Sequence, residues 1–272
     1  MHYEKPIVMY LAYEPYGISY LKKFLKNYKK YKSGYDHELL ICFKKFKNIK
    51  NIKNWSKIVT FKFTKFIDKE IENDFDIGSY FRVAKKYNNR KILFLGTHTV
   101  PLVDNWLYFF IKNYEKNSVV GATGSYASIP SIFFEFYFKQ HTKFQQLRWG
   151  LQHMLKVKLF PNPHIRTTGF FMSAMDFLSL TFDKNKLTKK IETNYFEGGR
   201  KGMSQQLISR GFKLFIINSD NKKFLIPDWP KSQTYCCKNQ EKLIFGDNRT
   251  NEYAVASKEI KKKLKKIVWG IK

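Results

Sequence analysis

The sequence predicts an α/β fold in which helices alternate with the strands of one mostly parallel sheet. Short apolar runs typical of buried strands recur along the first half of the chain, and most are followed by segments whose apolar residues have helical spacing. Elements that alternate in this way form parallel sheets with right-handed crossovers. The 272 residues contain no internal repeat and no low-complexity linker, so we expect a single domain.

The expected elements follow in order along the chain. Strands are expected over residues 6–12, 38–43, 57–61, 91–95 and 118–122. Helices are expected between them over 18–31, 78–87 and 104–114, the last capped by Asp104. An aromatic-rich helical stretch then covers 130–158, and strands at 167–172 and 213–217 flank a helix at 201–210. Since ligands of parallel sheets bind at the carboxyl ends of the strands, we expect the site in the loops after Ala12, Phe61, Leu95 and Ala122.

The charge of the chain is its most unusual property. A formal net charge of +28 attracts polyanions such as nucleic acid, anionic lipid or phosphorylated substrates. An equally good interpretation is a compositional bias toward lysine that no partner has selected. Lysine far outnumbers arginine, and zinc-finger, RNP-type and basic-zipper signatures are absent from the sequence, so we do not expect nucleic acid to be the partner.

Cellular location is predicted from three features. The first residues lack the basic start and apolar run of a signal peptide, and no stretch reaches the ~18 apolar residues of a membrane-spanning helix. The three cysteines, Cys42, Cys236 and Cys237, are odd in number and do not suggest a disulfide framework. A cytoplasmic location therefore fits best, with peripheral attachment to the cytoplasmic face of a membrane as an option.

Several short motifs now follow one another in an informative order. They are 76–78 (DIG) with Arg82, 94–101 (FLGTHTVP), 104–107 (DNWL), 168–172 (TGFFM), 196–200 (FEGGR) and 209–212 (SRGF). Together, over residues 6–217, they resemble the inverting glycosyltransferases of family 2. The resemblance implies a GT-A-like three-layer α/β/α sandwich over 1–250, with 130–165 as a helical segment on the acceptor side. It also implies a nucleotide-diphosphate sugar as donor and a glycan or lipid-linked glycan as acceptor.

One departure from the family pattern concerns metal. The family has an aspartate-rich triplet where this chain has Gly96, Thr97 and His98. Because Mg²⁺ and Mn²⁺ prefer carboxylate oxygens, we expect that no metal cofactor is required. His98 remains the one candidate ligand if Mn²⁺ or Mg²⁺ does bind, although a lone histidine is more often structural.

The resemblance also places the catalytic base. The family's Glu-Asp pair is Glu197-Gly198 here, so Glu197 is the candidate that takes the proton of the acceptor hydroxyl. The alternative is a carboxylate at a helix start that interacts only with the helix dipole.

Without a metal, side chains must offset the charge of the departing diphosphate. The candidates are His164, Arg166 and Arg200, with Arg249 a weaker one. The resemblance assigns Tyr13, Glu14 and Asp76 to the nucleoside, and adds Arg82, Gly96 and His98 to the donor site. For each arginine the alternative is an ordinary surface salt bridge.

The last segment, 251–272, has the pattern of a basic amphipathic helix. Ile260, Leu264, Ile267 and Val268 share one face, lysines fill the other, and Trp269 stands where an interfacial aromatic would bind a bilayer. The alternative is that the apolar stripe packs on the domain. Three other functions also stay open: a metal-dependent or retaining transferase on the same fold, a non-catalytic nucleotide- or sugar-binding protein, and a polybasic nucleic-acid binder.

Overall fold

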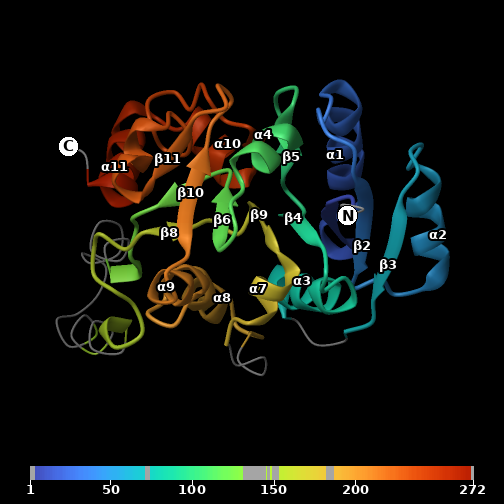
Figure 1. Ribbon diagram of the computed structural model, residues 1–272, viewed down its shortest axis with the longest axis horizontal. Helices are drawn as coiled ribbons and strands as arrows, with labels where there is room; N and C mark the ends of the chain where they lie inside the picture. The colour runs from blue at the N-terminus through green and yellow to red at the C-terminus, as the bar shows by residue number, and fades with distance from the viewer. Residues whose placement is uncertain are drawn as a thin grey trace.

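The computed structural model describes residues 4–70, 74–130, 145, 148, 153–181 and 187–270. Its central sheet has eight strands in the order β11-β10-β6-β9-β4-β1-β2-β3 (Figure 1). Their bounds are β1 (Ile7–Tyr13), β2 (Glu38–Lys44), β3 (Thr64–Asp68), β4 (Lys91–Leu95), β6 (Ser118–Gly121), β9 (Gly169–Ser173), β10 (Lys213–Ile217) and β11 (Lys223–Leu225). Two short antiparallel pairs join β5 (Val100–Pro101) to β12 (Phe245–Gly246) and β7 (Gly124–Ser125) to β8 (His164–Ile165).

Helices cover both faces of the sheet, which makes three layers. One face packs against α1 (Ile18–Lys30), α2 (Ile49–Lys57) and α4 (Trp106–Asn113). The other face packs against α3 (Phe75–Lys86), α7 (Ala174–Leu178), α8 (Lys190–Gly198), α9 (Met203–Ser209), α10 (Asn248–Val255) and α11 (Lys258–Trp269). Two 3-10 helices, η1 (Glu14–Tyr16) and η4 (Ile226–Lys231), lie in the connections. The predicted single-domain α/β fold is confirmed.

The direction of the strands determines where the site lies. Strands β1, β2, β3 and β4 are parallel to one another, and β6 is parallel to β10. Strand β9 lies between β4 and β6 and is antiparallel to both. The start of β9 therefore meets the carboxyl ends of its neighbours at one edge of the sheet.

Strand β1 shows how one sequence supplies both cores. Ile7, Met9 and Leu11 pack on the α3 side, whereas Val8 and Tyr10 pack on the α1 side. This alternation follows from the two-residue period of a strand.

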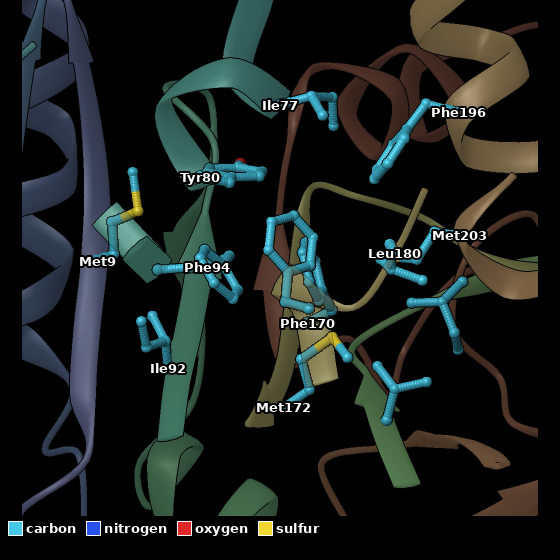
Figure 2. Packing of buried hydrophobic residues seen from close by; sticks show 14 of the residues in the cluster. Met9, Ile77, Tyr80, Ile92, Phe94, Phe170, Met172, Leu180, Phe196 and Met203 are labelled. Carbon is cyan, nitrogen blue, oxygen red and sulfur yellow. The ribbon is translucent and has the colours of Figure 1, made fainter. Parts of the chain in front are cut away.

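Aromatic rings pack among methionine and aliphatic side chains in the core on the α3 side (Figure 2). Phe94 of β4 and Phe170 of β9 stack with ring centroids 4.9 Å apart, and Tyr80 of α3 lies 5.1 Å from Phe94. These contacts attach α3 to the strands whose ends form the site.

The predicted strand over 57–61 is wrong. Residues up to Lys57 belong to α2, whose cap Asn48 accepts a hydrogen bond from the Asn51 N–H at 2.8 Å, and β3 begins only at Thr64. Ile52, Trp55 and Val59 are buried at helical spacing, so the apolar residues after Lys57 complete the packing of α2 rather than start a strand.

The predicted cap at Asp104 is also wrong. Asn105, in a left-handed conformation with φ of 60°, precedes the first residue of α4. The Asp104 carboxylate instead accepts a hydrogen bond from the Lys32 N–H at 2.7 Å. Asp104 thus joins the end of the α1 segment to the α4 segment.

Other boundaries differ by a few residues. The helix expected at 78–87 is α3, the one expected at 201–210 is α9, and the strand expected at 167–172 is β9. Of the segment 130–165, residues 131–144, 146–147 and 149–152 lie outside the described residues. Its described end contains β8, a strand that the aromatic helical pattern did not predict.

The C-terminal helix α11 packs on the domain. Ile267, Val268 and Trp269 are buried, and the Trp269 indole donates a hydrogen bond to the Tyr235 carbonyl oxygen at 2.9 Å. Trp269 is therefore not available as an interfacial aromatic, and the packing alternative describes this end of the helix. Among the helices of the described residues, none has the length and apolarity needed to cross a membrane.

Candidate functional site

A cavity of about 1050 Å³ opens at the carboxyl ends of β1 and β4. The polar residues of its lining include Tyr13, Asp76, Thr97, His98, Thr99, His164, Arg166, Thr167, Thr168, Lys190, Glu197 and Arg249. The apolar residues of its lining include Ala127, Ile129, Val157, Leu264, Ile267 and Val268. The cavity thus lies where parallel α/β sheets bind ligands, and segments far apart in sequence build it.

The antiparallel strand β9 brings residues 164–168 to this edge. The Thr99 hydroxyl donates a hydrogen bond to the Thr168 carbonyl oxygen at 2.6 Å, and the Arg166 N–H donates to the Thr123 carbonyl oxygen at 3.1 Å. The Tyr80 hydroxyl donates to the Thr167 carbonyl oxygen at 3.3 Å. These bonds fix the segment between the ends of β4 and β6.

Glu197 faces this segment. Its Oε1 accepts a hydrogen bond from the Thr167 N–H at 2.6 Å and lies 3.4 Å from the Thr167 hydroxyl. Glu197 lies in the last turn of α8, whereas the sequence placed it before a helix start. A favourable interaction with a helix N-terminus therefore does not explain this carboxylate.

Asp76 is a second carboxylate of the cavity. Burial raises the pKa of Asp76, the Lys190 ammonium opposes this rise, and the Glu197 carboxylate adds to it. Asp76 lies in the first turn of α3, and Lys190 begins α8. Two acids and one lysine, supplied by α3 and α8, therefore influence one another at the cavity.

His164 lies against the α8 end of the site. Its Nδ1–H donates a hydrogen bond to the Asn162 carbonyl oxygen at 2.8 Å, because a carbonyl oxygen can only accept. Burial lowers the pKa of His164, although the Glu197 carboxylate acts in the opposite direction. The ring is therefore neutral at pH 7, and the proton on Nδ1 leaves Nε2 as its acceptor nitrogen.

Arg166 forms a buried ion pair. Its Nη1 lies 3.0 Å from Oδ2 of Asp247, and its guanidinium lies over the Tyr235 ring at 3.9 Å from the centroid. Burial alone raises the pKa of Asp247, but the Arg166 cation and the Thr250 N–H lower it below its usual range. Asp247 also caps α10 through the Thr250 N–H at 2.8 Å. Arg166 lines the cavity with its charge already paired.

His98 lies among aromatic rings. Its ring centroid is 4.9 Å from that of Tyr16 and 4.6 Å from that of Tyr20. Burial lowers its pKa, with Asp247 acting in the opposite direction. The end of β4 therefore offers an imidazole, hydroxyls and backbone oxygens.

This donor set lacks the carboxylate oxygens that Mn²⁺ and Mg²⁺ prefer, so it does not fit the divalent metal that the family resemblance implies. Residues 96–98 contain none, and Asp247 is bound to Arg166. In the part of the chain that the structure describes, no group of three or more His, Cys, Asp or Glu side chains is arranged to hold a metal ion.

Three of the predicted donor-site residues lie outside the cavity lining. The Glu14 carboxylate accepts hydrogen bonds from the Lys47 N–H at 2.6 Å and from the Asn51 amide at 2.5 Å, which joins η1 to α2. The exposed Arg200 donates through Nε to the Met154 carbonyl oxygen at 3.2 Å. Arg82, the third, pairs with Asp68 and Asp74.

A partly buried network of charged side chains surrounds the start of α3. Arg82 binds both oxygens of Asp68 at 2.7 Å and contacts Asp74 at 2.6 Å. Lys44, fully buried, donates to Asp74 and to the Phe75 carbonyl oxygen. These bonds hold Phe75 at φ of 51° and position the adjacent Asp76 at the cavity.

Sequence reasoning missed several cavity residues. Lys190, Tyr235 and Asp247 line or support the site, and α11 contributes Leu264, Ile267 and Val268. Only Asp247 carried a usable signal, because Asp247 with Thr250 matches a capping pattern before a helix. The others come from contacts between distant segments.

Comparisons with known proteins identify the fold. No family model and no curated protein matches the sequence. Among solved structures, that of GalNAc-T7 with UDP, GalNAc and Mn²⁺ matches with a TM-score of 0.51 and 12% identity, over 97% of this chain and 52% of that one. The chain therefore spans about half the length of that structure.

Two further structures are similar at lower scores. The galactosyltransferase LgtC has a TM-score of 0.42 and 10% identity over 78% of this chain and 73% of its own. The mannosyltransferase Ktr4p from S. cerevisiae has a TM-score of 0.38 and 10% identity over 71% of this chain and 62% of its own. The similarity to GalNAc-T7 confirms the predicted GT-A-like α/β/α sandwich.

Proposed function

We propose that this chain is a glycosyltransferase that moves a sugar from a nucleotide-diphosphate sugar to a glycan or lipid-linked acceptor. The observation that carries the proposal is the cavity at the carboxyl edge of a GT-A-like sheet with Glu197 and Asp76 in its wall. The structure of GalNAc-T7, which is similar in fold, contains UDP, GalNAc and Mn²⁺, and this supports a nucleotide-sugar donor.

Glu197 is the proposed general base, and the transfer proceeds with inversion. The carboxylate takes the proton of the acceptor hydroxyl while the acceptor oxygen attacks the anomeric carbon, and the bond to the nucleotide diphosphate breaks on the opposite face. General-base assistance of this kind is worth ~10²–10⁴ in rate. The Thr167 N–H, 2.6 Å from Oε1, holds this carboxylate in position.

The departing diphosphate is proposed to be bound by cavity side chains rather than by a metal. Lys190, Arg249 and the Thr97 hydroxyl are the proposed donors in the lining, because His164 and the Thr99 hydroxyl already give their protons to carbonyl oxygens. Arg166 is paired with Asp247, so it is proposed to act on the diphosphate only through its positive electrostatic potential. The absence of carboxylates at residues 96–98 supports this part of the proposal.

A thermal-shift panel with UDP, TDP, GDP and CMP tests the proposal. A ligand at 100 times its Kd stabilises the folded state by ~2.7 kcal/mol, so the matching nucleotide raises the Tm. Product stereochemistry with the matching donor then distinguishes inversion from retention. If none of the four nucleotides raises the Tm, the proposed function is contradicted.

A non-catalytic nucleotide- or sugar-binding protein is the second candidate. The observation in its favour is the carboxylate-free segment at residues 96–98. Such a protein would be stabilised by one nucleotide yet transfer no sugar from the corresponding donor, with or without Mn²⁺.

A further inference from the structure

Exposed apolar side chains gather in one short segment next to the cavity. Leu155 is 83% exposed and Leu159 is 52% exposed, and Met154 and Phe160 are exposed as well. Elsewhere in the described residues, large exposed apolar side chains stand apart from one another along the chain, as at Ile49, Ile67, Met175, Leu225 and Val255. Contiguous exposed apolar surface is typical of an interaction site, whereas single exposed residues are not.

Basic side chains are interspersed with these apolar ones. Lys156 and Lys158 are exposed within the segment itself. Arg200 and Lys201, also exposed, are held beside it, since the Arg200 N–H donates to the Lys156 carbonyl oxygen at 2.8 Å. Glu192 is the acidic partner, with one oxygen 3.6 Å from the Lys156 ammonium. We call residues 154–160 with Arg200 and Lys201 the rim surface.

The rim surface is continuous with the wall of the cavity. Val157 is buried, lines the cavity and forms a bridge with Gly199, two residues after Glu197. Phe160 lies against Gly270 at the end of α11, so close that a Cβ added to Gly270 would come 2.8 Å from the Phe160 ring. Ile267 and Val268 of that helix line the same cavity. An apolar path therefore leads from the exposed segment to the site.

We propose that the rim surface binds an anionic lipid bilayer and turns the cavity toward the membrane. Leucine and phenylalanine side chains enter the boundary between headgroups and acyl chains, and the basic residues bind the anionic headgroups. The net charge of +28 adds long-range attraction of the same sign. This inference rests on the proposed function. With the cavity at the membrane surface, the acceptor of the transferred sugar is a lipid-linked one.

Sedimentation of the full chain with lipid vesicles tests the proposal. We expect binding to vesicles of phosphatidylcholine with phosphatidylglycerol, weaker binding at high salt, and little binding to phosphatidylcholine alone. The variant Leu155→Ser with Leu159→Ser is expected to bind the anionic vesicles at least ~10-fold more weakly. Lys156→Gln with Lys158→Gln is expected to weaken binding chiefly at low salt.

Matched controls use exposed apolar residues away from the rim surface. Met175→Ser with Val255→Ser removes side chains that are 65% and 87% exposed, and this variant is expected to bind vesicles as the unaltered chain does. Equal vesicle binding by the Leu155→Ser, Leu159→Ser variant and the Met175→Ser, Val255→Ser variant would overturn the proposal. Gel filtration tests whether a second copy of the chain covers the rim surface instead. A dimer that is lost only in the Leu155→Ser, Leu159→Ser variant would assign the surface to that copy and overturn the proposal.

The two proposals fail separately. Nucleotide stabilisation without vesicle binding overturns the membrane contact and leaves the transferase proposal intact. Vesicle binding without stabilisation by any nucleotide does the reverse.

Discussion

The Glu197 carboxylate, in the last turn of α8, accepts a hydrogen bond from the backbone N–H of Thr167 at 2.6 Å, across thirty positions of sequence. The bond joins the α8 end to the segment that enters β9. It fixes one carboxylate oxygen at the edge where β4 ends, beside His164 and within reach of the electrostatic influence of Asp76.

The first prediction concerns this carboxylate. Glu197→Gln keeps an oxygen that accepts from Thr167, so the fold and nucleotide binding are expected to persist while turnover falls by at least ~10². Single-turnover kinetics and a thermal-shift titration measure the two effects. Glu192→Gln, on the same helix but outside the cavity lining, is the control and should retain turnover. Near-normal turnover of Glu197→Gln on the true acceptor removes Glu197 from the role of base.

The second prediction concerns metal. Because residues 96–98 provide no carboxylate, activity is expected to survive EDTA. Activity is measured before and after chelation, and again with added Mn²⁺. Complete loss in chelator with recovery in Mn²⁺ would contradict this and make His98 a metal ligand, which His98→Ala would then test.

The third prediction concerns the buried pair of Arg166 and Asp247. Arg166→Ala leaves the Asp247 carboxylate buried without its cation, so the free energy of unfolding is expected to fall by about 3–5 kcal/mol. Urea unfolding measures the change. Arg249→Ala breaks the exposed pair with Glu252, and there the loss is expected to stay below about 1 kcal/mol. Equal losses in the two variants would show that burial does not govern the Arg166 pair.

The pH dependence of the same pair is the fourth prediction. The pKa of Asp247 is lower in the folded chain than in the unfolded chain, so the unfolded state binds the proton more tightly. The stabilisation is fully present above the unfolded value of about 3.9 and is lost as the pH falls through the lower folded value. Unfolding free energies measured from neutral to acid pH should therefore converge for Arg166→Ala and the unaltered chain. Parallel curves would contradict the assignment.

The fifth prediction concerns α11. Trp269 is buried and hydrogen-bonded to Tyr235, so Trp269→Ala is expected to destabilise the fold by about 3–5 kcal/mol. Val255→Ala, at an exposed position, should change stability by no more than about 0.5 kcal/mol. Thermal unfolding measures both. A Trp269→Ala variant with unchanged Tm would mean that the helix end does not pack as described.

The sequence by itself determined most strands of the central sheet and the edge of the sheet at which the cavity opens. Apolar runs such as that of β1 have a strand signal strong enough to be recognised locally, and parallel strands place their carboxyl ends together. The strand prediction failed at 57–61, because Ile58 and Val59 after the helix resemble a short strand in sequence. Only their packing with α2 shows that they are not one. At Asp104 the capping pattern was overruled by a hydrogen bond to the distant Lys32.

Only the tertiary structure decided which candidate residues meet. Nothing in the local sequence separates the candidates that line the cavity from those that do not. Tyr13, Asp76 and Arg166 line the cavity. Glu14, Arg82 and Arg200 bind partners outside its lining. The place of α11 could not be predicted from its sequence either. Its apolar face was evident, but packing on the domain and insertion into a bilayer both bury such a face. Long-range contacts decided between them, because the pairing of one buried surface with another is a property of the folded chain.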